Sequence, residues 1–250
     1  MAVVGSSGSG KSLLAHAVMG LLPYNGSWKG DIRYRGEALT EKRLKKLRGR
    51  EIVLVPQSVS YLDPLMRAGE QVRKGKRDSE SREKCRRVLG RYGLGPETEE
   101  RYPFELSGGQ KRRVAIAGVL AMNPKVLILD EPTAGLDPMG RDEILDQIAS
   151  LHETRGITII LVSHSMEDIA KYVERIIVMN HGVKTFDDAP KKVFAHYKEL
   201  EAIGLAAPQI TYIMHALKEK GLDVDTSAIN VDEATTSILR ALWKKEEDHK

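Results

Sequence analysis

The sequence has a single cysteine, Cys85, among its 250 residues. One thiol excludes an internal disulfide framework and any metal or iron–sulfur site that needs several cysteines. A reducing, cytosolic setting fits that count. Long apolar runs are also missing. The candidate run Ile157–Val162 has the length of a strand, whereas a membrane span needs roughly 18–20 apolar residues.

Other features are absent as well. The N-terminus lacks a basic region followed by an apolar one, so no export signal is expected, and any membrane connection should come through a partner. Lys and Arg total 39 against 35 Asp and Glu, and a net charge of +4 is too small to indicate nucleic-acid binding. Neither repeats nor low-complexity segments occur. Contents of 41% apolar and 30% charged residues exclude wholesale disorder.

Three short runs are continuously apolar, namely Val53–Val55, Val126–Leu129 and Ile159–Val162. Runs of this kind are typical of strands buried on both faces of a parallel sheet. Helix-length segments such as Met139–Thr154 separate them. The alternation predicts an α/β fold with right-handed crossovers.

The segment Leu39–Arg91 is polar, basic and mostly helical in pattern, with one strand at Ile52–Val55. We interpret it as an edge region followed by a helical lobe beyond Gln57. Arg67–Arg91 contains ten basic and four acidic residues, and a charge run of this kind is typical of a solvated helical face.

Towards the C-terminus, the pair His181-Gly182 predicts a hairpin turn. Ile210–Leu217 has one apolar helical face, which Gly221 would end, and Val231–Leu242 predicts another short helix. We place a domain boundary near residue 200.

A glycine- and serine-rich loop fits the pattern G-x-x-x-x-G-K-[ST] between a strand-like Ala2–Val4 and a helix-like Leu13–Leu22. Its members are Gly5, Ser6, Ser7, Gly8, Ser9, Gly10, Lys11 and Ser12. Such a loop directs several backbone N–H groups at an anion, beside the positive end of the helix dipole. Lys11 would reach the β- and γ-phosphates, and Ser12 would ligate Mg²⁺. The alternative is a flexible turn, which the strand–loop–helix context disfavours.

A second helix start lies at Leu106–Gln110, ahead of the helix-like run Arg112–Met122. Ser107 is a candidate N-cap, and Gly108 and Gly109 would expose backbone N–H groups to a phosphate. Taken alone, a Ser-Gly-Gly turn usually only starts a helix.

Asp130 and Glu131 follow four apolar strand residues, and ligands of open parallel sheets gather at the carboxyl ends of strands. We therefore expect both beside the nucleotide. Asp130 would hold Mg²⁺, and Glu131 would orient the attacking water or accept its proton. Acidic residues at a helix N-terminus are the alternative, but Pro132 disfavours helical backbone at Glu131.

Two more polar residues follow predicted strands. His164 ends an apolar run, and its ring would hydrogen-bond a γ-phosphate oxygen and the attacking water, although a lone histidine more often has a structural role. Gln57 follows the strand Ile52–Val55 in the same way, where it would reach Mg²⁺ or the water.

Together these residues resemble the ATP-binding cassette (ABC) ATPases over about residues 1–190. Gly5–Ser12 resembles the Walker A motif, Gln57 the Q-loop, and Leu106–Gln110 the family signature. Val126–Asp130 with Glu131 is similar to Walker B, Ala134–Asp137 to the D-loop, and His164 to the switch histidine. The motifs occur in the order and at the spacing of the family.

The resemblance implies an α/β fold with a P-loop NTPase core, a mostly parallel sheet and a helical signature subdomain. It places the ABC domain at 1–200, its helical subdomain at about 60–122, and a short helical C-terminal extension, for dimerisation, at 201–250. Cassettes of this family pair head to tail. Ser107, Gly108 and Gly109 would then face the ATP that the partner cassette holds on its own Gly5–Ser12.

A finer likeness divides the chain. Val4 to about Pro103 resembles cassettes of nickel and peptide importers, through Met19–Pro23 and Pro56–Pro64. From Leu106 onward the chain is more similar to cassettes of energy-coupling-factor importers for cobalt, nickel and vitamins. Peptide-importer cassettes often end in a cysteine-bearing extension, and this chain lacks those cysteines.

Family members usually carry two strands and an adenine-stacking aromatic residue before Walker A. Only four residues precede Gly5 here. The resemblance therefore implies a truncated N-terminal antiparallel edge, no adenine platform, and weakened ATP binding, since base stacking contributes roughly 1–3 kcal/mol.

The function implied is that of the ATP-hydrolysing subunit of an importer. Transmembrane permease subunits and a second cassette would be its partners, at the cytoplasmic face of the membrane, with ATP and Mg²⁺ bound. Nickel or cobalt is the expected cargo, and a vitamin or peptide the alternative. Two other classes stay open: a soluble ABC ATPase of DNA repair or translation, and an inactive truncated cassette.

Overall fold

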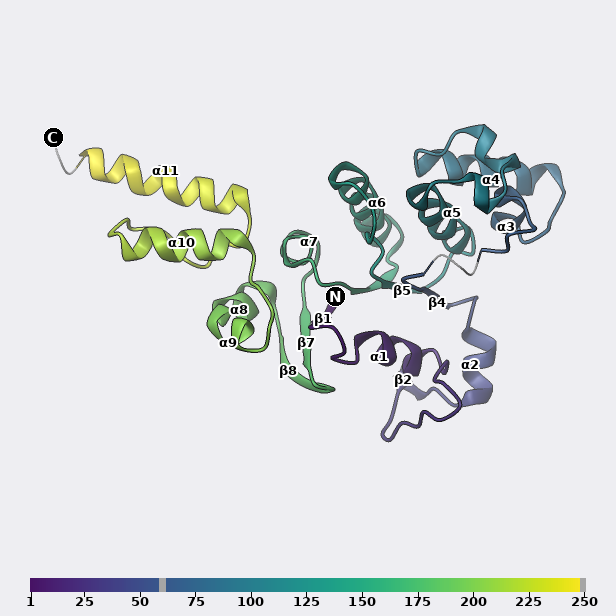
Figure 1. Ribbon diagram of the computed structural model, residues 1–250, viewed down its shortest axis with the longest axis horizontal. Helices are drawn as coiled ribbons and strands as arrows, with labels where there is room; N and C mark the ends of the chain where they lie inside the picture. The colour runs from purple at the N-terminus through teal and green to yellow at the C-terminus, as the bar shows by residue number, and fades with distance from the viewer. Residues whose placement is uncertain (59–61, 248–250) are drawn as a thin grey trace. The chain divides into compact units, whose positions relative to one another are not determined.

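The computed structural model describes residues 1–58 and 62–247 (Figure 1). Residues 59–61, which belong to the importer-like segment Pro56–Pro64 and to the start of the expected helical subdomain, lie outside the described residues. The chain divides into two compact units, residues 12–162 and residues 1–11 with 163–250. Each unit is described in turn.

A six-stranded sheet provides three strands to each unit, and a separate two-stranded sheet completes the β-structure. In the unit 12–162, β4 (Ile52–Val55), β5 (Val126–Asp130) and β6 (Thr158–Val162) are parallel neighbours. In β5, Leu127, Ile128 and Leu129 are almost fully buried, as expected for a strand covered on both faces. The predicted α/β class and these three strands are therefore confirmed.

Helices of the same unit begin and end at recognisable signals. The predicted helix Met139–Thr154 is observed as α6 (Pro138–Arg155), whose N-cap Asp137 accepts a hydrogen bond from the Gly140 N–H and whose C-cap is the left-handed Gly156. By contrast, α1 (Lys11–Val18) is shorter than the predicted Leu13–Leu22. Gly20, at φ 61°, turns the chain away while the apolar pattern continues.

The middle of this unit's sequence forms a helical lobe. It consists of α3 (Ala68–Val72), α4 (Ser79–Arg91) and α5 (Gly108–Leu120), which lie together in Figure 1. Two 3-10 turns, Pro96–Glu100 and Pro103–Glu105, connect α4 to α5. The smaller elements of the unit are α2 (Glu41–Leu47) and the antiparallel pair β2 (Arg33–Tyr34) and β3 (Glu37–Ala38).

A buried charge cluster fastens this lobe. Glu99 is 4% exposed and pairs with both Arg73, which follows α3, and Arg86 on α4, the latter at 3.0 Å. One carboxylate thereby joins α3, α4 and the 3-10 turn. Removing Glu99 would leave two guanidinium groups without their shared counter-charge, a costly arrangement for the buried Arg73.

In the other unit, β1 (Ala2–Gly5) pairs in parallel with β7 (Ile176–Asn180), which pairs antiparallel with β8 (Val183–Asp188). The predicted hairpin at His181-Gly182 joins β7 to β8, and both turn residues have positive φ, at 45° and 78°. On β8, the pKa of Asp187 is lowered by hydrogen bonds to its carboxylate from Arg175, which precedes β7, and from Lys184 of the same strand.

The remaining helices of this unit are α7 (Met166–Tyr172), α8 (Pro190–Ala195), α9 (Tyr197–Ala202), α10 (Gln209–Glu219) and α11 (Val231–Glu247). The predicted helices of the tail are thus observed as α10 and α11, which lie side by side in Figure 1. Met214, Val224 and Ala234 belong to their shared apolar core. Within residues 1–58 and 62–247, no helix has the length and apolar character that crossing a bilayer requires.

Candidate nucleotide site

The phosphate loop joins β1 to α1, as predicted from the motif. Gly8 and Gly10 have φ of 78° and 95°, values that only glycine adopts readily, so they let the backbone curl. A Cβ at Gly5 would collide with the Met179 carbonyl oxygen and the Ser9 Oγ. The loop is therefore built around residues without side chains at these points, as close approach to a phosphate requires.

The side chains of Lys11 and Ser9 have different surroundings in the loop. Lys11 Nζ donates to the carbonyl oxygens of Gly5 (2.7 Å) and Ser6 (2.9 Å), which holds the ammonium group over the loop. Ser9 is buried, and its Oγ has no hydrogen-bond partner among the described residues. The Gly182 N–H of the β7–β8 turn donates to the Ser9 carbonyl oxygen at 3.2 Å, so the hairpin braces the loop from its own unit.

The signature segment starts α5 through a reciprocal cap. The Gln110 N–H donates to Ser107 Oγ at 3.2 Å, and the Ser107 N–H donates to Gln110 Oε1 at 3.0 Å. This capping box confirms Ser107 as the N-cap. Ser107 and Gly108 are exposed, and a Cβ at Gly109 would meet Leu136 Cδ2 at 3.1 Å. The exposed part of the turn thus includes the backbone of Gly108, which no side chain of its own covers.

The acidic pair ends β5. Asp130 is 3% exposed, and its Oδ1 has no hydrogen-bond partner in the described part of the chain. A buried carboxylate oxygen with a vacant acceptor position suits a cation or a cation-bound water. Glu131 has φ 48°, so it lies outside the right-handed helical region, as Pro132 predicts. Its N–H donates to the Val162 carbonyl oxygen at 2.8 Å.

Arg112 on α5 connects two of these segments. Its Nη1 donates to the Glu131 carbonyl oxygen at 2.7 Å, and its Nη2 donates to the Gln57 carbonyl oxygen. Arg112 is buried, so one guanidinium ties the ends of β4 and β5 to the signature helix. No motif points to Arg112. The sequence offers one weak signal, an arginine leading directly into the apolar run of a helix.

The other predicted residues are accessible. The Gln57 side chain is exposed after β4, and His164 is exposed between β6 and α7. In the described residues, no group of three or more His, Cys, Asp or Glu is placed to hold a metal ion. A cation would therefore need other ligands, and the predicted set of Ser12, Gln57 and Asp130 is of that mixed kind.

The candidate residues are shared between the two units. Gly5, Ser6, Ser7, Gly8, Ser9, Gly10, Lys11 and His164 belong to one unit, and Ser12, Gln57, Ser107, Gly108, Gly109, Asp130 and Glu131 to the other. Within the second unit, Arg112 brings the Gln57 and Glu131 backbones together. That the phosphate loop and the acidic pair adjoin one nucleotide stays a prediction.

Comparisons with known proteins identify the family of the chain. Residues 1–134 match the model of the ABC transporter family. The energy-coupling factor transporter ATP-binding protein EcfA2 of Acetivibrio thermocellus is 43% identical over 97% of this chain and 86% of its own length. EcfA2 of Clostridium tetani is 44% identical over 98% and 86%.

Solved structures are similar too. The structure of cbiO1 from Clostridium perfringens, described as part of the ABC transporter complex cbiONQ, has a TM-score of 0.66 at 33% identity and covers 87% of this chain and 86% of its own. The dimeric cassette MJ0796 in a post-hydrolysis state with ADP and Pi has a TM-score of 0.67 at 30% identity, over 75% of this chain and 84% of its own.

The chain therefore belongs to the ABC transporter family, as an ATP-binding subunit with the α/β cassette fold. It is an ABC transporter ATPase. Its likeness to EcfA2 runs through nearly the whole sequence, including the part before Pro103 in which we noted segments similar to nickel and peptide importers.

Proposed function

We propose that this chain is the ATP-hydrolysing subunit of an energy-coupling-factor importer and that it drives uptake of a transition metal ion, nickel or cobalt, with a vitamin or peptide as the alternative cargo. The observation that carries the proposal is the identity of 43% with EcfA2 over 97% of the chain. Nickel or cobalt is proposed because transition metals are cargo of both kinds of importer that the two parts of the sequence resemble.

The proposed reaction is in-line attack of water on the γ-phosphorus of ATP. The new bond joins the water oxygen to phosphorus, and the bond from phosphorus to the β–γ bridging oxygen breaks. Lys11 and the loop N–H groups neutralise charge on the phosphates. Glu131 orients the water and takes its proton, and His164 hydrogen-bonds a γ-phosphate oxygen.

Ser12, Gln57 and Asp130 are the residues proposed to hold Mg²⁺. The unpartnered Oδ1 of Asp130 supports this assignment. When bound, Mg²⁺ supplies positive charge to the phosphate oxygens. The chain's own contribution is a buried carboxylate whose Oδ1 accepts no hydrogen bond from the described residues.

Two kinds of partner belong to the proposal. One partner is a second cassette, whose bound ATP would contact Ser107, Gly108 and Gly109 of this chain. The exposure of the Ser107 turn supports that role. The helical extension, where Leu239, Leu242 and Trp243 are exposed on α11, would add to the pairing. Transmembrane subunits would dock near Gln57–Arg91 and hold the protein at the cytoplasmic face of the membrane.

The test is an ATP hydrolysis assay of the unaltered chain. It is run with and without the transmembrane proteins that neighbouring genes encode. Lys11→Ala removes the ammonium group from the loop and should abolish ATP binding or turnover. Unchanged hydrolysis in Lys11→Ala would refute the assignment of the phosphate loop. Uptake of radioactive nickel, cobalt or vitamin by the reconstituted complex decides the cargo.

A further inference from the structure

An exposed aromatic ring lies just before the signature turn. Phe104 belongs to the 3-10 turn Pro103–Glu105, and Leu106 begins the signature segment two positions later. The Phe104 side chain is 70% exposed, whereas Pro103 and Leu106 are buried. Single apolar residues are common on protein surfaces, so the significance of this ring depends on how the chain holds it.

A second aromatic ring supports Phe104. The Phe104 ring stacks on Tyr102 with ring planes 6° apart and centroids 5.5 Å apart, an offset-stacked arrangement. Tyr102 is in turn held by Arg67, whose guanidinium carbon lies 5.6 Å from the Tyr102 ring centroid and which also pairs with Glu100. We call the two stacked rings the Phe104–Tyr102 platform. It is a flat apolar surface with its own support rather than a loose side chain.

The backbone of the platform is held by hydrogen bonds. The Tyr102 N–H donates to Glu105 Oε2 at 2.7 Å, and the Glu105 N–H donates to the Tyr102 carbonyl oxygen at 3.0 Å. The Leu106 N–H donates to the Pro103 carbonyl oxygen at 3.1 Å. These bonds restrict the backbone on both sides of Phe104. A ligand that stacks on an already ordered ring loses less of its binding free energy to ordering the protein.

The support of Phe104 distinguishes it from other exposed aromatic side chains. Among residues 1–58 and 62–247, the exposed Phe, Tyr and Trp side chains are Tyr24, Trp28, Phe104 and Trp243. Of these, Phe104 is the one that stacks on another aromatic ring. The platform is thus a local feature of the segment that leads into the signature turn.

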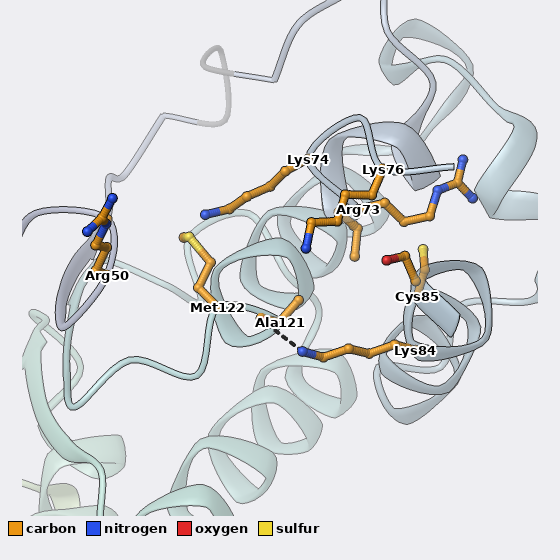
Figure 2. Close-up of a pocket in the computed structure, with 11 residues that line it drawn as sticks. Arg50, Arg73, Lys74, Lys76, Lys84, Cys85, Ala121 and Met122 are labelled. Atoms are coloured by element: carbon orange, nitrogen blue, oxygen red, sulfur yellow. Dashed lines mark hydrogen bonds between the residues drawn. The ribbon is translucent and has the colours of Figure 1, made fainter. Parts of the chain in front are cut away.

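A cavity of about 320 Å³ in the same lobe has the opposite chemistry. Its cationic lining residues are Arg50, Arg73, Lys74, Lys76 and Lys84 (Figure 2). None of the described lining residues is aromatic, so this cavity suits an anion and not a flat uncharged ring. At the platform the nearby charges include the carboxylates of Glu100 and Glu105, which disfavour phosphate. The platform therefore suits the base of a nucleotide rather than its phosphates.

We propose that Phe104 stacks on the adenine ring of the ATP held by the paired cassette, a second copy of this chain. The inference rests on the proposed function, because it needs the Ser107 turn to face that ATP. Three residues separate Phe104 from Ser107, a reach of up to about 10 Å of chain. This reach is comparable to the distance between the γ-phosphate and the base of an extended ATP. One segment would thus contact both ends of the same nucleotide.

The experiment uses the full chain carrying Glu131→Gln, in which ATP should hold two copies together. Light scattering follows pairing as ATP is added with Mg²⁺. Adding Phe104→Ala should raise the ATP concentration for half-maximal pairing at least about fivefold, the low end of what one stacked base contributes. Phe104→Tyr keeps the ring and should pair as the parent does. The matched control is Leu65→Ala, which removes an apolar side chain that is 87% exposed and should leave pairing unchanged.

CTP separates base stacking from other contacts of Phe104. Cytosine offers a smaller ring surface than adenine, so Phe104→Ala should weaken pairing with ATP more than pairing with CTP. Equal weakening with both nucleotides would overturn the proposal and assign Phe104 to a protein contact or to the folding of the turn. Pairing of Phe104→Ala at the ATP concentration of the Leu65→Ala control would also overturn it.

The same titration separates this inference from the proposed function. If the Glu131→Gln parent does not pair with ATP, the paired mechanism and the stacking role of Phe104 are both wrong. If the parent pairs and Phe104→Ala changes nothing, only the stacking role is wrong, and the proposed ATPase mechanism stands.

Discussion

Single residues near the candidate site have roles that their geometry defines, and Arg112 is the clearest. Arg112→Ala removes donors from the carbonyl oxygens of Gln57 and Glu131 in a buried place. We expect about 1.5–3 kcal/mol of lost stability, the usual range for hydrogen bonds to a charged group, together with reduced turnover. Urea unfolding and ATPase assays measure the two effects.

Arg112→Lys is the informative companion variant. Lysine keeps the positive charge but lacks the planar fork that reaches two acceptors at once. Arg112→Lys should therefore recover less than half of the stability that Arg112→Ala loses. If Arg112→Ala unfolds at the urea concentration of the unaltered chain, the link between these segments contributes nothing.

Tyr92 provides a pH-dependent prediction. Burial raises its pKa to about 12, above the ordinary value of 10.0. Between pH 10 and 12 the unfolded chain loses a proton that the folded chain retains, so stability falls with rising pH through that window, by up to about 3 kcal/mol. Thermal unfolding from pH 9 to 12 should show this fall, and Tyr92→Phe should show a smaller one. Identical slopes for the two proteins would contradict the buried phenol.

Among the elements, α5 depends on its first residue. Ser107→Ala removes an N-cap acceptor, which usually costs about 1 kcal/mol and corresponds to about 2–4 °C in Tm for a chain of this size. Ser107→Gly should lose only a few tenths of a kcal/mol because glycine also tolerates the cap position. Calorimetry compares the three proteins. A fall in Tm no larger for alanine than for glycine would contradict the cap.

The helices and strands also show what sequence patterns can and cannot predict. Strands β4, β5 and β6 follow from continuous apolar runs, and the β7–β8 turn follows from one dipeptide, since these signals are local. β2 and β3 have two residues each, too few for a period to emerge. The Glu99 pairs and the Arg112 hydrogen bonds join residues 13 to 55 positions apart, and no local pattern encodes them.

Predicted site residues divide in a similar way. The phosphate loop and the Ser107 cap are short motifs whose backbone geometry depends on glycine and serine at fixed positions, and the structure has that geometry. The roles of Gln57 and His164 depend on where exposed side chains point when ATP is bound, which stays a prediction. Asp130 lies between these cases, because its burial follows from the strand and its vacant oxygen does not.

For the whole molecule, pairing of two cassettes is the property to test. Glu131→Gln removes the proposed proton acceptor while keeping the residue's size, so ATP should remain bound and hold two copies together. Light scattering should give about twice the monomer mass for this variant with ATP and Mg²⁺, and the monomer mass with ADP. Lys11→Ala combined with Glu131→Gln is the control that should stay monomeric. A monomer under every condition would count against the paired mechanism.

The lone thiol of the chain has a practical consequence. Cys85, on α4, is 1% exposed within the α3–α4–α5 lobe, and burial raises its pKa, with Arg73 and Arg86 offsetting only part of that effect. Alkylating reagents should consequently modify the native protein only when this lobe opens. The rate at which iodoacetamide alkylates Cys85 therefore reports how often the lobe opens locally. A ligand that stabilises the closed lobe should slow this alkylation.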